Sequence, residues 1–121
     1  MSVSGAGQRI QAAVGGWQGI TMSSHRFGGV EFKVGNREIG HVHGDTLVDV
    51  PLPKGVRNAL VASGEADPHH ILPQSGWVSV YLNDTGDVDR AIRILRWSFE
   101  IARQQQERRA AHEVTPSSYL D

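Results

Sequence analysis

The chain of 121 residues contains no cysteine, no long apolar run and few aromatic residues, which make up 7% of the total. The absence of cysteine excludes a disulfide scaffold, a zinc site built on thiolates and thiol catalysis. A membrane-spanning helix needs about 18 consecutive apolar residues, so we expect no membrane segment. The first seven residues have neither the basic start nor the apolar core of a signal peptide, so we expect a cytoplasmic protein.

Neither positive nor negative residues are in excess, because the chain has 12 basic and 13 acidic residues and a net charge of −1. A balanced chain has no general attraction to nucleic acid or to an anionic membrane. Arginines recur between residues 90 and 109, but Glu100 and Glu107 interrupt them. We therefore interpret this stretch as a solvated helix face, so a nucleic-acid partner is a less favoured alternative that stays open.

The length and apolar content suit one domain with one core, which we place at residues 1–109. Residues 110–121 have little apolar content and contain a proline, so we expect a flexible C-terminal tail.

The spacing of apolar residues predicts helices over residues 8–17, 54–62 and 87–108. Alternation and turn signals predict strands over residues 20–27, 30–34, 37–43, 46–52 and 77–82. Residues 67–75 are expected to form a loop. The order predicts an α+β fold, with an antiparallel sheet of about five strands backed by two to three helices.

Histidines gather in two places. His41 and His43 are two apart in a predicted strand, so both project from one face. His69 and His70 lie in the predicted loop. Asp49 stands in the middle of an apolar strand and orients a histidine if it shares their face. These five residues are the candidate catalytic residues, because imidazole is both a base and a metal ligand at neutral pH.

A structural interpretation competes with this one. The histidines on the strand would then be outward polar residues, those in the loop would hold a turn, and Asp49 would be solvated. If a metal is bound, it is a divalent ion at the His-x-His pair with a third ligand from the loop or a carboxylate. Trp77, Ser79 and Tyr81 give the last predicted strand an aromatic, hydrogen-bonding face, and they are the candidate ligand-binding residues.

Three stretches of the chain carry a resemblance to a known family: GHVHGDTLVDVPLPKGVRNAL, PHHILPQSGWVSVYL and DVDRAIRILRWSF. Together they resemble the small luciferase-like domain family, also described as a domain of unknown function, over about residues 28–103. The resemblance implies a fold and marks six residues as part of the motif: His41, His43, Asp49, His69, His70 and Trp77. The resemblance assigns no role to any of them, and it does not establish light emission. The strand–helix–strand–helix half also resembles the YjbR/MmcQ-type α+β fold.

The favoured hypothesis is a domain that binds or transforms a small molecule where the His41/His43 strand meets the loop of His69 and His70. Trp77 would form one wall of the pocket. The alternatives are a non-enzymatic module that binds a protein or DNA, and a structural subunit without a ligand. We also expect a homodimer, because one sheet face is predicted to be open and because Trp97 and Phe99 lie on the last helix.

Overall fold

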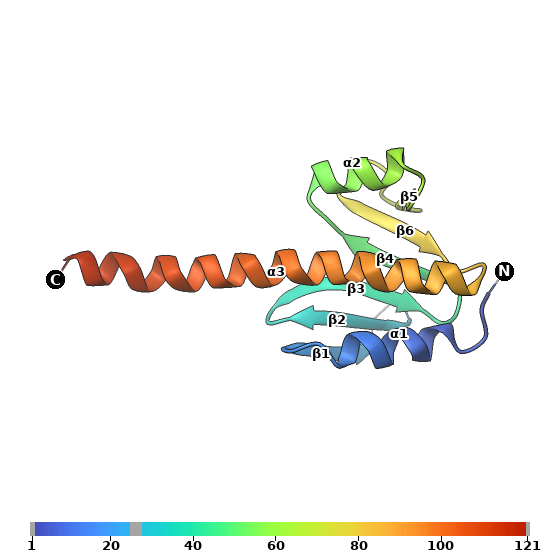
Figure 1. The fold of residues 1–121 in the computed structure, drawn as a ribbon, viewed down its shortest axis with the longest axis horizontal. Coiled ribbons are helices and arrows are strands. Elements are labelled where there is room, and N and C mark those ends of the chain that lie inside the picture. Colours follow the sequence, from blue (N-terminus) through green and yellow to red (C-terminus); the bar gives the residue numbers. More distant parts are fainter. Residues whose placement is uncertain (1, 25–27, 121) are drawn as a thin grey trace.

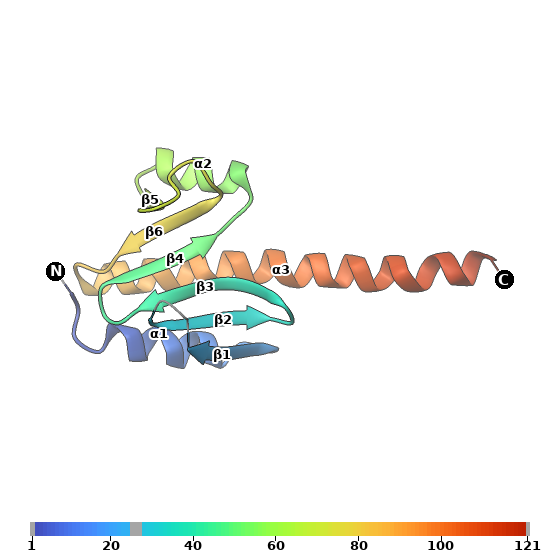
Figure 2. The same ribbon diagram turned by 180° about the vertical axis from the view of Figure 1, so that it is seen from behind.

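The computed structural model describes residues 2–24 and 28–120 and shows one antiparallel sheet with all three helices on one of its faces (Figures 1 and 2). The elements in chain order are α1 (Ala6–Gly15), β1 (Ile20–Ser24), β2 (Val30–Val34), β3 (Arg37–His43), β4 (Leu47–Pro51), α2 (Lys54–Ala62), β5 (Asp67–Pro68), β6 (Trp77–Tyr81) and α3 (Thr85–Leu120). The strand order in the sheet is β1-β2-β3-β4-β6-β5. The predicted α+β class is confirmed.

Most strands lie where alternation predicts them, with two differences at the edges of the sheet. The strand expected over residues 20–27 is β1, which ends at Ser24, and residues 25–27 lie outside the described residues. β5 was not predicted, since it has only two residues and falls inside the expected loop. Its pairing with β6 adds a sixth strand to the sheet.

α3 differs most from its predicted length. We placed its end near Arg108 and expected an extended tail, whereas the helix continues through residues 110–120. Residues 87–115 contain neither glycine nor proline, so the sequence offers no stop signal before Pro116. The helix also continues past Pro116, for which the sequence gives no reason. Its C-terminal half extends beyond the end of the sheet (Figure 1). Among the described residues, no helix is long and apolar enough to cross a membrane.

The core lies between the sheet and its helices. Val48, Val50 and Val80 turn their side chains to α3 and are fully buried, as are Ile10 of α1 and Leu95 of α3. Because side chains alternate along a strand, the residues between these valines point to the opposite face of the sheet. That face, seen in front of α3 in Figure 2, carries the polar residues described below.

The start of α3 is held by a reciprocal pair of capping hydrogen bonds. Asp84 Oδ1 accepts the backbone N–H of Asp87 at 3.0 Å. The Asp87 carboxylate accepts the backbone N–H groups of Asn83 and Asp84, at 2.8 and 3.1 Å. It also accepts a hydrogen bond from Arg90 at 2.7 Å. This is a capping box with aspartate in the third position of the helix.

Asp87→Asn is expected to lower the free energy of unfolding by about 1 kcal/mol at neutral pH. Burial alone raises the pKa of Asp87, but the two N–H groups and Arg90 outweigh it and hold the pKa below the ordinary 3.8. A carboxylate with a lowered pKa stabilises the fold above its unfolded pKa, and this stabilisation is lost as the pH falls through the folded value. Urea denaturation at neutral and acidic pH should therefore show the difference between the two proteins shrinking below about pH 4.

The matched control is Asp89→Asn in the same helical turn. Asp89 makes an exposed ion pair with Arg9 of α1, so its loss should change stability by less than about 0.5 kcal/mol. A difference between wild type and Asp87→Asn that stays constant down to acidic pH would contradict the role given to the charge.

Candidate functional site

The site starts from one row of residues that crosses the helix-free face of the sheet. In the register, His41 of β3 pairs with Asp49 of β4, and Asp49 pairs with Ser79 of β6. The row continues to Glu31 on β2 and to Asp67 on β5. Directly paired residues point to the same face, so the sheet itself brings a histidine, a carboxylate and a hydroxyl together.

Asp49 is the centre of the cluster, and its side chain is fully buried. Its Oδ2 atom lies 3.1 Å from Nε2 of His41, of His43 and of His70. His69 Nε2 lies 3.5 Å from the same oxygen. Ser79 Oγ donates to the other oxygen, Oδ1, at 2.8 Å. The four histidines of the two sequence motifs therefore converge on one carboxylate oxygen.

The loop after β5 brings His69 and His70 to this point. β5 pairs with β6 through Pro68 and Val78, and the backbone N–H of His70 donates to Ser79 Oγ at 3.3 Å. His69 Nδ1 accepts the backbone N–H groups of the next residues, Ile71 at 3.2 Å and Leu72 at 3.0 Å. An accepting Nδ1 carries no proton, so neutral His69 carries its proton on Nε2, which faces Asp49.

Glu38 completes the contacts of His41. Its Oε2 atom lies 2.6 Å from His41 Nδ1, so His41 lies between two carboxylates. Burial lowers the pKa of His41, but Asp49 and Glu38 outweigh it and raise the pKa to about 9. At neutral pH, His41 is therefore a cation that donates to both acids.

The other two shifted groups respond to the same contacts. Burial raises the pKa of Asp49, but hydrogen bonds from His41, Ser79 and His70 reverse this and hold the pKa well below its ordinary value. Burial lowers the pKa of His69, and the neighbouring His70 and His41 act in the same direction against the attraction of Asp49. The cluster therefore combines a protonated imidazole, an ionised carboxylate and a neutral imidazole.

A cavity of about 280 Å³ opens over the cluster. It is lined by Glu38, His41, His43, His69, His70, Ile71, Leu72 and Trp77. The Trp77 ring stands 5.3 Å from the His41 ring and 5.8 Å from the His69 ring, between centroids. Ile71 and Leu72 are 71% and 53% exposed. The cavity thus has a polar floor, one aromatic wall and an aliphatic rim.

Two further cavities, of about 400 and 510 Å³, lie where α3 passes the turn between β2 and β3. Gly35 and Gln106 line both of them. The residues around these cavities include no histidine and no aspartate. Although they are larger, they bring together no groups suited to catalysis or to metal binding.

The structure brings together His41, His43, Asp49, His69 and His70, the five residues that we proposed from the sequence. Of the three proposed ligand-binding residues, Trp77 lines the cavity and Ser79 holds Asp49. Tyr81 is exposed and is not among the lining residues.

Sequence reasoning missed Glu38, which is three residues from His41 and so belongs to the other face of a regular strand. Here Phe32 pairs with Gly40 and Lys33 pairs with Glu38, so Ile39 is an extra residue in β3. This bulge returns Glu38 to the face of His41. The glycine at the irregularity was the only local signal.

The comparison with known families covers this part of the chain. The family model described as Luciferase domain matches residues 36–98, more than half of the chain. The chain belongs to the Luciferase domain family. Every residue that lines the cavity of this Luciferase domain lies within the matched range, as do Asp49 and Ser79. No curated protein and no solved structure matches the chain, and the likeness to the YjbR/MmcQ-type fold stays a prediction.

Proposed function

We propose that this Luciferase domain binds a small molecule in the cavity over the histidine cluster. The observation that carries the proposal is the division of the cavity into a polar floor and an apolar rim. Small-molecule sites commonly combine apolar walls with a few placed polar groups that orient the ligand. A ligand would set its polar group against Glu38 and the histidines of the floor, and its apolar part against Ile71, Leu72 and Trp77.

The rim supports binding because its apolar side chains are exposed to water, which is unfavourable, and a ligand would cover them. Ile71 and Leu72 are adjacent, and both belong to the loop that carries His69 and His70. Burial of an aliphatic side chain of this size contributes about 1.5–3 kcal/mol. The volume of the cavity is at the lower end of the range for ligand pockets, so a ligand would be small.

The floor also bears on the chemistry available to a bound molecule. Imidazole and carboxylate side chains are the commonest groups for proton transfer in enzymes, and a ligand on this floor would contact both. Asp49 would then orient the imidazoles rather than react, because it is fully buried beneath them.

The proposal is tested by NMR on the full chain with a set of aromatic and short aliphatic carboxylic acids, phenols and amides. We expect members of the set to shift the indole N–H resonance of Trp77 and the methyl resonances of Ile71 and Leu72. Shifts confined to residues outside the cavity, or no shift with any compound, would contradict the proposal.

Replacement of Ile71 and Leu72 by serine should weaken the binding of such a compound by about tenfold or more, since apolar contact area is lost. Both side chains are exposed, so the free energy of unfolding should change by less than about 0.5 kcal/mol. Met22→Ser is the matched control, because Met22 is also an exposed apolar side chain but lies on β1, outside the cavity. Equal affinity in all three proteins would show that the rim does not contact the ligand.

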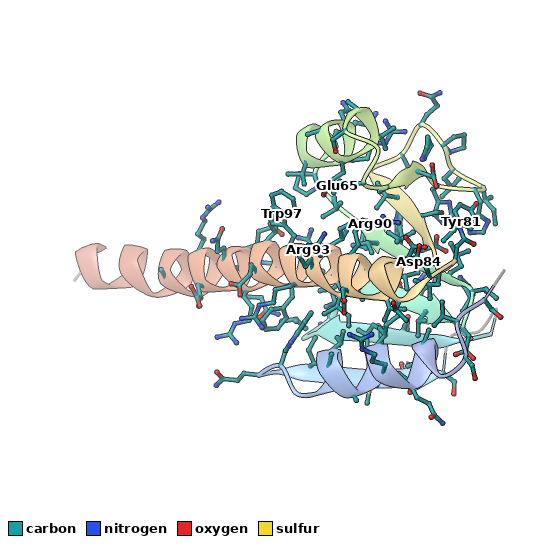
Figure 3. The ribbon with its side chains drawn as sticks, turned by 45° about the vertical axis from the view of Figure 1, so that its right-hand side comes forward. Glu65, Tyr81, Asp84, Arg90, Arg93 and Trp97 are labelled. Carbon is teal, nitrogen blue, oxygen red and sulfur yellow. The ribbon has the colours of Figure 1, made fainter. Side chains whose placement is uncertain are left out.

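An interaction module with a protein or DNA partner is the alternative. Trp97 is 49% exposed and extends from α3 on the side of α2 (Figure 3). Two arginines elsewhere on the helix form ion pairs, Arg96 with Glu100 and Arg103 with Glu107, which favours a protein partner over DNA.

A homodimer through α3 remains a proposal. Trp97 is available for it, whereas Phe99 is buried and packs against Trp17 at 5.2 Å between ring centroids. Sedimentation equilibrium should show a dimer for wild type and a monomer for Trp97→Ser. A monomeric wild type would contradict this proposal and leave the cavity unaffected.

A further inference from the structure

We propose that the floor of this cavity is a site for one divalent transition-metal ion, held by His41 Nε2, His43 Nε2, His70 Nε2 and Asp49 Oδ2. The inference rests on the proposed small-molecule site and deepens it, because the ion would be the group that a ligand's polar atom contacts. Three observations carry it: the distances of the three nitrogens from Asp49 Oδ2, the contacts that orient two of the ligands, and the position of the cavity above them.

Each of the three histidine nitrogens is about as far from Asp49 Oδ2 as two ligands of one ion are from each other. The nitrogens of His41, His43 and His70 each lie 3.1 Å from Asp49 Oδ2. The ligand atoms of His41, His43 and Asp49 all lie within 4.8 Å of one another, and so do those of Asp49, His69 and His70. Tetrahedral ligands at metal distances of about 2.0–2.1 Å are roughly 3.3 Å apart. His41 and His43 thus form one triad with Asp49, and His70 belongs to a second triad that shares Asp49. Rotation of the His70 side chain toward the first triad would bring the four atoms around one ion.

The neighbouring contacts already orient two of the four ligands. Glu38 accepts from His41 Nδ1, which points His41 Nε2 at the cluster. Ser79 donates to Asp49 Oδ1 and leaves Oδ2 toward the histidines. A carboxylate behind a ligating histidine and a hydrogen bond to a ligating carboxylate are the usual supports of metal ligands.

His69 is excluded from the ligand set by its own hydrogen bonds. Its Nδ1 atom accepts the N–H groups of Ile71 and Leu72, so its Nε2 atom carries the proton. Metal binding would displace the proton that His41, His43 and His70 place toward Asp49 Oδ2, whereas the two N–H groups on His69 Nδ1 fix the His69 proton on Nε2. Of these four histidines, His69 also lies farthest from Asp49 Oδ2. His69 would instead donate to the carboxylate and hold the loop in place.

The donor set indicates the class of ion. Three imidazoles and one carboxylate suit zinc, cobalt, nickel, copper or ferrous iron, whereas magnesium and calcium prefer oxygen ligands. The cavity opens on the same histidines, so an exchangeable position on the ion would face the space between Trp77 and the aliphatic rim. A ligand would thus offer the ion an oxygen or nitrogen atom and the rim an apolar body.

The test uses the full chain, freed of metal with a chelator and dialysed, then titrated with zinc by calorimetry and with cobalt by visible absorption. We expect one equivalent per chain and the intense visible bands of tetrahedral cobalt. Wild-type protein that takes up neither ion, or that shows only the weak spectrum of hydrated cobalt, would overturn the proposal.

Matched variants separate ligands from neighbours. His43→Asn and His70→Asn should each weaken zinc binding by at least about 100-fold, and Glu38→Gln should weaken it by about 10–100-fold at unchanged stoichiometry. His69→Asn keeps an oxygen acceptor for the Ile71 and Leu72 N–H groups and should retain the metal and its cobalt spectrum. Circular dichroism of each chelated variant confirms that it is folded. An equal loss in His69→Asn and His43→Asn would overturn the assignment.

The two proposals can fail separately. Compounds that bind the metal-free cavity when no ion binds would overturn the metal site and leave the small-molecule site standing. One equivalent of bound ion in a protein that binds no compound, whether metal-loaded or metal-free, would overturn the small-molecule site and leave the metal site standing.

Discussion

Asp49→Asn is expected to lower the free energy of unfolding of the metal-free protein by about 3–5 kcal/mol, because it removes the negative charge from a buried ionic cluster. Asp49 is fully buried and contacts four histidines through a single oxygen. His41, which is a cation at neutral pH, would keep Glu38 alone as its counter-charge. An asparagine side chain would also turn its NH₂ group or its single carbonyl oxygen toward several imidazole donors, and it cannot satisfy all of them.

Guanidinium denaturation in the presence of a chelator measures the effect. Asp67→Asn is the matched control, since Asp67 lies in the same cross-strand row but is exposed. Its change should stay within about 0.5 kcal/mol. A similar small loss in both variants would contradict the view that the Asp49 charge neutralises the histidine cluster.

Gly40→Ala is expected to lower the free energy of unfolding by about 3 kcal/mol or more, because overpacking and backbone strain add at this position. Gly40 has a φ of +153°, which L side chains rarely adopt. A Cβ atom there would meet Leu95 Cδ2 of α3, and it would lie 2.9 Å from the carbonyl oxygen of Asp49. The backbone of β3 thus approaches α3 too closely for any side chain.

Thermal and urea unfolding should show the loss, with Gly55→Ala as the control. Gly55 lies in α2, where a Cβ atom meets nothing within 4 Å, so alanine should be neutral or stabilise by up to about 1 kcal/mol. In a double-mutant cycle, Leu95→Ala should recover part of the Gly40→Ala loss, because the two side chains compete for one space. Strict additivity in that cycle would show that contact with Leu95 is not the cause.

The fold was predictable where the signal is local. Apolar alternation is a property of each strand, so β2 and β3 begin and end at the predicted residues. The helix over residues 54–62 is bounded by Pro53 and by Gly64, and it too matches. β5 and the end of α3 were missed for the opposite reason: a two-residue strand has no period, and the last helix has no stop signal before Pro116 and continues past it.

The candidate site was predictable in part for the same reason. The alternation of β3 places His41 and His43 on one face, and the valines around Asp49 assign it to the face opposite the core. The meeting of these residues with His69 and His70 depends on the pairing of β4, β6 and β5, which is not local. The place of Glu38 in the site depends on a bulge in β3. The tautomer of His69 depends on the backbone N–H groups of Ile71 and Leu72, which the sequence pattern does not predict.

The length of α3 has a consequence for how the size of this protein is measured. A helix of 36 residues is about 54 Å long, whereas a compact chain of 121 residues has a radius of gyration of about 14 Å. A molecule with such a protruding helix has a large frictional ratio and tumbles at different rates about its long and short axes. Gel filtration would therefore overstate its mass, and a monomer would elute near the volume of a globular dimer.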